Sequence, residues 1–321
     1  SAGAGALLVP ELNPLSQNSA LQIIGRPVEL SLTSVSAQTV QLSIVPIENG
    51  KPQPIPQDGS LAEQRWPAPV ARLASLPAFR AEAADGISIP APLGTIPELN
   101  LTLQPVVTGR VLAEWLLTKQ SERAAQSAAA ALVKLHHSEI WPARTHTVAD
   151  ELEILAARFT ALTAVRPHWE NRLRELLEYC RELARQLPIV VPRPIHRDFY
   201  HEQLLWDGTR VWLLDLDLLC VGDPALDAGN FIGHLKEWGI RQPLARPTLE
   251  RAEVAFREAF LESSDRGSGR SLEVYTTLTL ARHVSLSTQF AERAPFAEQI
   301  LAATEARCHA ALGVETFSQS L

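Results

Sequence analysis

Residues 195–205 read Ile195-His-Arg-Asp-Phe-Tyr-His-Glu-Gln-Leu-Leu205, a run in which polar residues stand between apolar ends. Two acidic runs follow it, Leu213-Leu-Asp-Leu-Asp217 and Gly222-Asp-Pro-Ala-Leu-Asp227. Like charges that lie close together are unfavourable unless a cation or hydrogen-bond donors offset them. The carboxylates between 198 and 227 therefore indicate a functional site that needs such a partner.

A β-hairpin is predicted to join the first two of these runs. Asp207-Gly208 lies between apolar segments, and this dipeptide favours a tight hairpin turn. With a two-residue turn, Trp206 pairs with Thr209, and the antiparallel register places Asp215 beside Tyr200. A bulge of one residue would shift this register and change which side chains share a face.

In either register we expect Asp198, Gln203 and Asp215 to occupy one small volume. Carboxylates and an amide oxygen are hard ligands, and they suit Mg²⁺ that is shared with substrate phosphates. A separate loop aspartate, here Asp198, suits the acceptance of a hydroxyl proton. For Asp217, a metal role and a structural role are equally open.

From residue 109 onward the chain is predicted to be mostly helical, because apolar residues recur at helical spacing. Helices are expected at 121–137, 148–162, 169–183, 224–238, 248–262, 271–291 and 294–312. Ser121 and Asp223-Pro224 are predicted helix starts, since Ser and Asp are good N-caps and Pro suits the first turn. His136-His137 is predicted to contact a helix dipole. The exception is 189–217, where strands are predicted at 189–191, 203–206 and 211–217.

Residues 20–110 differ from the rest, because their apolar runs are short, β-branched or alternating. Strands are predicted at 21–24, 28–32, 40–45 and 101–107, with a hairpin turn at Asn49-Gly50 and a weak helix at 60–76. A domain junction is placed at Thr108-Gly109. The sequence thus predicts an α+β architecture of two lobes, 1–108 and 109–321.

The composition argues against several functions. The formal net charge is -7 and the pI about 5.8, so a broad basic face for nucleic acid is not expected. No apolar run reaches the length of a membrane span, and no membrane partner is expected. Three widely spaced cysteines argue against both a disulfide framework and a cysteine zinc site. They fit a reducing compartment, and we expect a cytoplasmic protein.

The order His-x-Asp-x4-Gln, a hairpin, Leu-Leu-Asp-Leu-Asp and Gly-Asp-Pro-x2-Asp resembles the aminoglycoside phosphotransferase and choline kinase-like family, which is related to the protein kinases. The match is specific across 195–230 and follows the family in order and length across 100–321. The resemblance implies a bilobal protein kinase-like fold. It also implies a phosphotransferase that uses ATP or GTP with Mg²⁺ and acts on a hydroxyl of a small molecule.

The resemblance also implies roles for individual residues. Asp198 matches the catalytic aspartate that orients the acceptor hydroxyl, and Asp215 and Gln203 match the metal ligands. His196 matches a position that braces the catalytic loop. Asp223 and Asp227 match residues that fix this loop and the following helix. The segment Leu103-Gln-Pro-Val-Val-Thr-Gly109 resembles the hinge, so Gln104, Pro105 and Val107 are implied to contact the nucleotide.

Three positions depart from the family pattern. Gln203 stands where the family has Asn, which keeps the amide oxygen but adds a methylene. Arg197 stands where the family has Gly and protein kinases have Arg. The family also expects a small-lobe lysine that holds the α- and β-phosphates. Lys51 is the only lysine before residue 109, and it lies in a predicted turn, where a solvated role is the simpler interpretation.

The sequence therefore predicts a small-molecule kinase whose acceptor is an aminoglycoside, an amino alcohol or a sugar. The acidic net charge is compatible with a cationic acceptor and equally with a sugar. The alternative is a degenerate kinase-like protein that binds nucleotide or a partner without turnover, as the missing lysine and Gln203 suggest.

Overall fold

The structure is a computed structural model that describes residues 21–24, 28–36, 39–48, 51–52, 68–91, 94–96, 101–105, 107–264 and 267–313. It divides into two compact units, Ser1–Thr108 and Gly109–Leu321. The predicted turn at Asn49-Gly50 lies outside the described residues, as does the part of the predicted helix 60–76 that precedes residue 68.

The first unit contains two small antiparallel sheets. In one, β7 (Leu101–Pro105) is the central strand between β1 (Leu21–Ile24) and β6 (Gly94–Ile96). In the other, β3 (Thr39–Glu48) lies between β2 (Val28–Ser36) and β4 (Lys51–Pro52). The unit also holds α1 (Ala68–Ser75), a 3₁₀ turn at Pro77–Phe79 and the short strand β5 (Ile87–Ser88). The strands predicted near residues 21, 28, 40 and 101 are all present.

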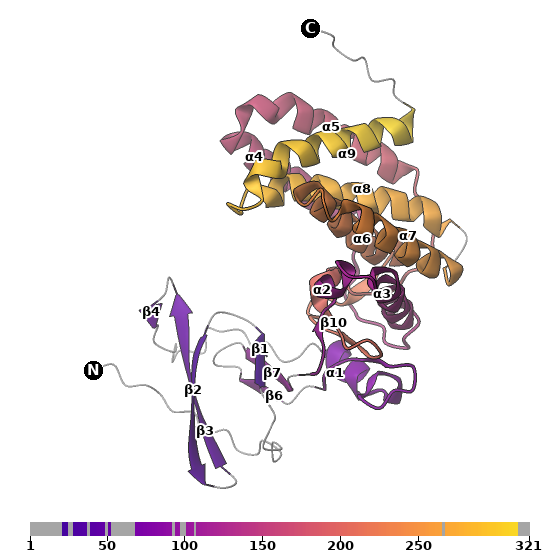
Figure 1. Ribbon diagram of the computed structural model, residues 1–321. Helices are drawn as coiled ribbons and strands as arrows, with labels where there is room; N and C mark the ends of the chain where they lie inside the picture. Colours follow the sequence, from indigo (N-terminus) through magenta and orange to yellow (C-terminus); the bar gives the residue numbers. More distant parts are fainter. Residues whose placement is uncertain are drawn as a thin grey trace. The chain divides into compact units, whose positions relative to one another are not determined.

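The second unit is mainly helical, and its longer helices occur where helical spacing of apolar residues predicts them (Figure 1). The helices are α2 (Leu112–Leu116), α3 (Ser121–His136), α4 (Val148–Val165), α5 (Glu170–Arg185), α6 (Pro224–Arg241), α7 (Arg246–Glu262), α8 (Ser268–Ser287) and α9 (Ala297–Leu312). Thr147 closes a capping box with Asp150 at the start of α4. The predicted N-cap at Ser121 is wrong, since Gln120 holds that position and makes no side-chain cap bond.

Two short antiparallel sheets in the second unit carry the motif residues. In one, β10 (Leu204–Trp206) lies between β8 (Arg110–Val111) and β11 (Val211–Leu213). In the other, β9 (Arg193–Ile195) pairs with β12 (Cys220–Gly222). The strand predicted at 189–191 is absent, and β11 ends at Leu213 rather than at 217. Ile189 is fully exposed, so its β-branched side chain gains no burial from a strand there.

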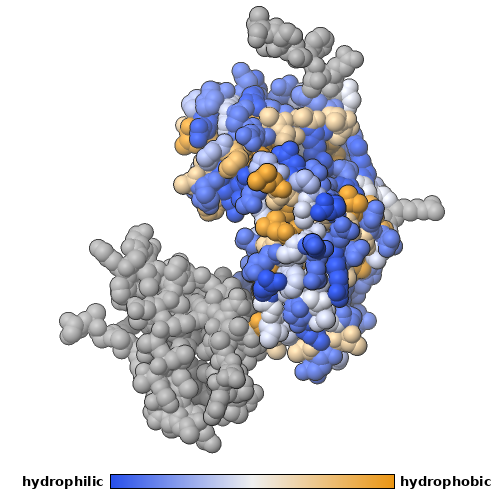
Figure 2. Space-filling model, in the orientation of Figure 1, coloured by the Kyte–Doolittle hydropathy of each residue, from blue (hydrophilic) through white to orange (hydrophobic). Residues whose placement is uncertain are grey.

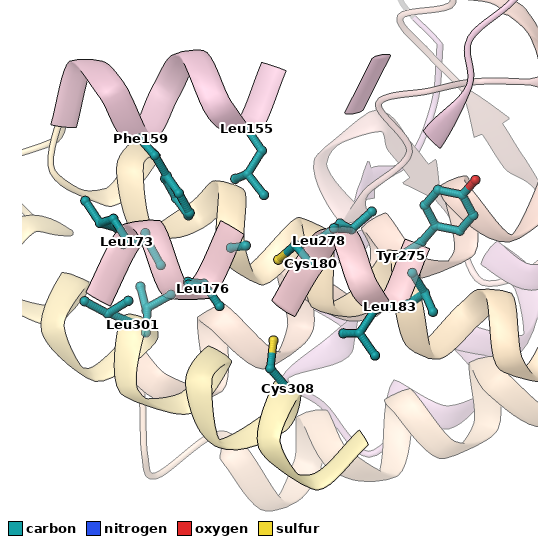
Figure 3. Packing of buried hydrophobic residues seen from close by; sticks show 14 of the residues in the cluster. Leu155, Phe159, Leu173, Leu176, Cys180, Leu183, Tyr275, Leu278, Leu301 and Cys308 are labelled. Carbon is teal, nitrogen blue, oxygen red and sulfur yellow. The ribbon is translucent and has the colours of Figure 1, made fainter. Parts of the chain in front are cut away.

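A core of apolar side chains joins α4, α5, α8 and α9 (Figure 3). Leu155 and Phe159 of α4 and Leu173 and Leu176 of α5 are at most 3% exposed. The thiols of Cys180 and Cys308 also lie in this core, and a hydrogen bond between them and burial raise the pKa of Cys180. The widely spaced cysteines are thus buried free thiols.

Helix α6 packs closely along α8 because two glycines remove side chains from the contact. A Cβ on Gly229 would lie 2.7 Å from the backbone nitrogen of Thr276, and one on Gly233 would lie 2.5 Å from Cγ2 of Thr279. Most of α6 is consequently buried, from Ala225 to Gly239. This helix supplies the polar residues that hold the functional loop.

The outward surface of the second unit is largely polar on the face drawn in Figure 2, with scattered apolar residues. Within the described residues, no helix combines the length and the apolar composition that crossing a membrane requires.

Candidate active site

Asp198 lies in the loop that connects β9 to β10, and the backbone of this loop has an unusual conformation. Arg197 has a φ of 73°, in the left-handed region that non-glycine residues rarely adopt. Glycine adopts this region without steric cost. Arg197 therefore holds a conformation that is unfavourable for a non-glycine residue, directly before Asp198.

Asp227 of α6 stabilises the start of the loop that carries Asp198. Its carboxylate is fully buried and accepts hydrogen bonds from the backbone N–H groups of His196 and Arg197, at 2.7 and 2.6 Å. The Nε2 of His136 donates to the same carboxylate at 3.0 Å. Three donors thus offset the buried charge of Asp227, as its burial requires.

The same helix fixes the loop on the other side of Asp198. Asn230, one turn after Asp227, donates from its side-chain amide to the backbone carbonyl of Phe199 at 3.0 Å. The Phe199 ring is fully buried and packs near the rings of Phe231 and Phe256. Asp198 therefore lies between two peptide groups that α6 holds in place.

Asp215 follows β11, and two hydrogen bonds connect its segment to the same loop. His196 donates from Nε2 to the carbonyl of Leu214 at 2.8 Å, and the N–H of Leu214 donates to the carbonyl of Gln203 at 2.9 Å. Asp215 itself has a φ of 52°. The side-chain amide nitrogen of Gln203 lies 3.0 Å from Oδ2 of Asp215 and donates to it. His196 thus braces the loop against the strand that carries Asp215.

The predicted hairpin register is wrong by two residues. Trp206 pairs with Val211, not with Thr209, so residues 207–210 form the loop. Asp207 stabilises this longer loop because its carboxylate accepts from the N–H groups of Thr209 and Arg210 at 2.8 and 2.7 Å. These bonds lower the pKa of Asp207. The shift brings Asp215 beside Gln203 rather than beside Tyr200.

The donor atoms of Gln203 and Asp215 suit Mg²⁺, for which one or two carboxylates plus substrate phosphates are usual. Rotation of the Gln203 amide about its last bond would turn its oxygen toward an ion at Asp215. Burial and the charge of Asp215 raise the pKa of Asp217. A cation would offset the repulsion between these two carboxylates. No group of three or more His, Cys, Asp or Glu side chains is arranged to hold a metal ion by itself, among the residues that the structure describes.

Two predictions about neighbouring residues have different outcomes. Asp223 is the N-cap of α6 and accepts from the N–H of Ala225 at 2.9 Å, as its sequence position predicts. The predicted contact with the helix C-terminus is present for His137, whose Nδ1 donates to the carbonyl of Val133 in the last turn of α3 at 2.9 Å. The ring of His136, in the same turn, is instead buried against Asp227. Sequence spacing gave no sign of this pair, since 91 residues separate its members.

A cavity of about 530 Å³ opens beside Asp198 within the second unit. Its lining includes Tyr200, His201 and Glu202 from the functional loop, and it extends to α4, α6 and α8. Burial, followed by the charge of Asp198, raises the pKa of Tyr200 to about 12. The volume is in the range of small-molecule sites.

Comparison with protein families gives a match to the phosphotransferase enzyme family across residues 63–270. This range is more than half of the chain. The chain belongs to the phosphotransferase enzyme family. The predicted resemblance is therefore confirmed, and a small-molecule phosphotransferase is the class of protein that the match supports.

Solved phosphotransferases share the fold at low sequence identity. A choline/ethanolamine kinase family protein from Mesorhizobium loti is 17% identical with a TM-score of 0.53, and the match covers 88% of this chain and 87% of that one. A putative aminoglycoside phosphotransferase from Ralstonia eutropha is 13% identical, with a TM-score of 0.54 and coverage of 91% and 95%. No curated protein matches the sequence.

A further solved structure is a thermostable mutant of the aminoglycoside phosphotransferase APH(4)-Ia, in a ternary complex with AMP-PNP and hygromycin B. It is 16% identical with a TM-score of 0.52, and the match covers 91% of this chain and 95% of that one. The protein kinase-like α+β fold predicted from the sequence is thus confirmed.

The predicted nucleotide contacts of this phosphotransferase family member lie in its first unit. Gln104 and Pro105 end β7, and Val107 follows. Lys51 begins β4, where its backbone pairs with Glu48. A nucleotide role for Gln104, Pro105 and Val107 stays a prediction, as does the solvated role of Lys51.

Proposed function

We propose that this protein transfers the γ-phosphate of ATP, or of GTP, to a hydroxyl group of a small molecule. The observation that carries the proposal is the position of Asp198. It lines a cavity of small-molecule size, and α6 anchors the peptide groups on both sides of it. A hydroxyl in this cavity could place its proton within reach of the Asp198 carboxylate.

Each residue of the site has a part in this proposal. Asp198 orients the hydroxyl and accepts its proton, while Asp227 and Asn230 keep its backbone from moving. Asp215 and Gln203 would hold Mg²⁺, which neutralises charge on the phosphates when it is bound.

The first unit is assigned to the nucleotide in the same proposal. Residues 1–108 would form the small lobe, with Gln104, Pro105 and Val107 against the adenine or guanine ring. Residues 109–321 would form the lobe that binds metal and acceptor. A cytoplasmic location also belongs to the proposal, because the three cysteines are buried free thiols.

The test is a phosphate-transfer assay with Asp198→Asn and Asp215→Ala. Loss of a positioned acid or base typically lowers the rate by about 10²–10⁴-fold, so we expect Asp198→Asn to lose at least about 100-fold. Asp215→Ala should also lose activity, because it removes a proposed ligand of Mg²⁺. Asp207→Asn is the matched control, because Asp207 lies on the same hairpin but serves the turn, where Asn also fits. Thermal unfolding of each variant would check that the fold is intact.

Wild-type transfer by Asp198→Asn would contradict the proposal. Stabilisation by ATP that requires Mg²⁺, without transfer to any acceptor, would favour the degenerate kinase-like protein instead.

A further inference from the structure

The cavity beside Asp198 is basic, although the chain as a whole is acidic. Five arginines and three carboxylates line it. The arginines are Arg158, Arg197, Arg241, Arg282 and Arg293, and the carboxylates are Asp198, Glu202 and Glu237. The net charge of -7 therefore does not describe the surface that an acceptor meets.

Only part of this positive charge is neutralised by the protein. Arg241 forms an ion pair with Glu237 at 2.7 Å. Arg282 lies 3.7 Å from Glu151, whose other carboxylate oxygen bonds to His146 at 2.6 Å. In the part of the chain that the structure describes, Arg158, Arg197 and Arg293 form no ion pair within 4 Å, although the charge of Glu151 also acts on Arg158 and Arg197.

Two of the guanidinium groups, those of Arg158 and Arg282, interact electrostatically, and Arg282 also donates from Nη2 to the side-chain oxygen of Asn230. Partial burial, followed by the charge of Arg282, lowers the pKa of Arg158. The Nε atoms of both arginines are buried and lack a hydrogen-bond acceptor among the described residues. Buried donors without a partner are costly, and so are like charges in close proximity. An anion bound in the cavity would offset the positive charge that these two groups share.

Neutral histidines complete the lining. His283 is 1% exposed, and both of its ring nitrogens lack a partner among the described residues. Burial lowers the pKa of His283, so its ring is uncharged at neutral pH. Neutral imidazole can donate or accept a hydrogen bond, which suits the polar groups of an acceptor.

The cavity offers little to a cationic acceptor. Glu237 is paired with Arg241, and Asp198 is assigned to the hydroxyl under the proposed function. The third carboxylate of the lining, Glu202, is exposed to solvent. One face of Tyr200, an aromatic ring of the lining, is stacked on His234 at 4.3 Å between centroids. An ammonium group would therefore meet more positive charge than negative charge.

We propose that the acceptor carries an anionic group, a carboxylate or a phosphate, beside its hydroxyl, and that Arg158, Arg282 and Arg293 bind this group. The proposal rests on the proposed phosphotransferase function for the position of the hydroxyl at Asp198. Guanidinium binds carboxylate and phosphate with paired, charge-assisted hydrogen bonds.

The first experiment measures anion binding without nucleotide, by calorimetry at constant ionic strength. The probes are inorganic phosphate, glycerate and glucuronate, against glycerol and glucose as neutral counterparts and choline and glucosamine as cationic ones. We expect at least one anionic probe to bind at least about 10-fold more tightly than its neutral counterpart. Arg158→Gln and Arg293→Gln should each weaken it by about 10-fold or more, as loss of a charged hydrogen bond predicts.

Arg174→Gln is the matched control, because Arg174 is exposed on α5 and bonds only to Asn171 in the described structure. It should bind the anionic probes as the wild type does. Preference for choline or glucosamine, or anion binding that neither cavity substitution weakens, would overturn the inference. Failure of every anionic probe to bind would overturn it as well.

A transfer assay with the same compounds separates this inference from the proposed function. Anion binding that depends on Arg158, together with no transfer to any compound, would contradict the phosphotransferase function and support the anionic site. Transfer to choline or glucosamine in preference to glycerate and glucuronate would support the function and overturn the inference.

Discussion

Asp227→Asn should destabilise the second unit, although it replaces only one carboxylate oxygen with an NH₂ group. Oδ2 of Asp227 accepts from the His196 N–H and from His136, and Oδ1 accepts from the Arg197 N–H. In the better of its two orientations, an asparagine keeps its oxygen at the Oδ2 position and turns its NH₂ toward the Arg197 N–H. One buried donor is then unsatisfied, which costs about 1–3 kcal/mol.

Asp227→Ala removes all three acceptors and should cost more, about 3–5 kcal/mol, the range measured when one partner of a buried charged pair is deleted. Equilibrium unfolding in urea, followed by tryptophan fluorescence, measures both free energies. Asp223→Asn is the control, because Asp223 lies on the same turn but acts as an N-cap, where Asn and Asp are equivalent. A free energy of unfolding for Asp227→Asn within about 0.5 kcal/mol of the wild type would refute the reasoning.

Two further predictions concern stability. Because the pKa of His201 is about 3 when folded and about 6.5 when unfolded, unfolding takes up a proton between these pH values. The stability that neutral His201 contributes is fully present above pH 6.5. As the pH falls from 6.5 toward 3, the free energy of unfolding should decrease by about 1.4 kcal/mol per pH unit. His201→Gln should reduce the slope of the free energy of unfolding against pH between pH 3 and 6.5, whereas His137→Gln, at an exposed position, should not. Equal slopes for the two variants would contradict this prediction. Gly229→Ala forces a Cβ against the backbone of α8 and should lower the free energy of unfolding by about 1–3 kcal/mol. Gly239→Ala lies on the same helix, but the nearest atom to its Cβ would be 3.5 Å away. It should leave the free energy of unfolding in urea unchanged or raise it by up to about 1 kcal/mol. Equal effects of the two would contradict the close-packing argument.

Much of the fold follows from local sequence signals. Helical spacing of apolar residues located α3 to α9, because these helices bury apolar side chains against their neighbours, and α6 and α8 are buried along most of their length. The hairpin register did not follow, because Asp207 uses its side chain to close a longer loop than Asp-Gly usually forms. The strand predicted at 189–191 failed because nothing covers Ile189.

For the candidate site as well, local sequence signals identified some residues and missed others. Asp198, Gln203 and Asp215 could be selected from their spacing, and the structure places the Gln203 and Asp215 side chains in contact. The contact between His136 and Asp227 could not be predicted from spacing, because it depends on how α3 packs against α6. The charge of the cavity could not either, since its arginines come from α4, the functional loop, α6, α8 and the segment after α8.

Backbone strain and buried hydrogen bonds coincide in this site. Among the described residues, Arg197 and Asp215 are the non-glycine positions with positive φ. Each such residue costs of order 1–3 kcal/mol and persists only where its surroundings hold it. Asp227 binds the N–H of Arg197, and His196 binds the carbonyl that precedes Asp215. The buried residues Asp227 and His196 therefore stabilise two unfavourable backbone conformations, one directly before Asp198 and one at Asp215 itself.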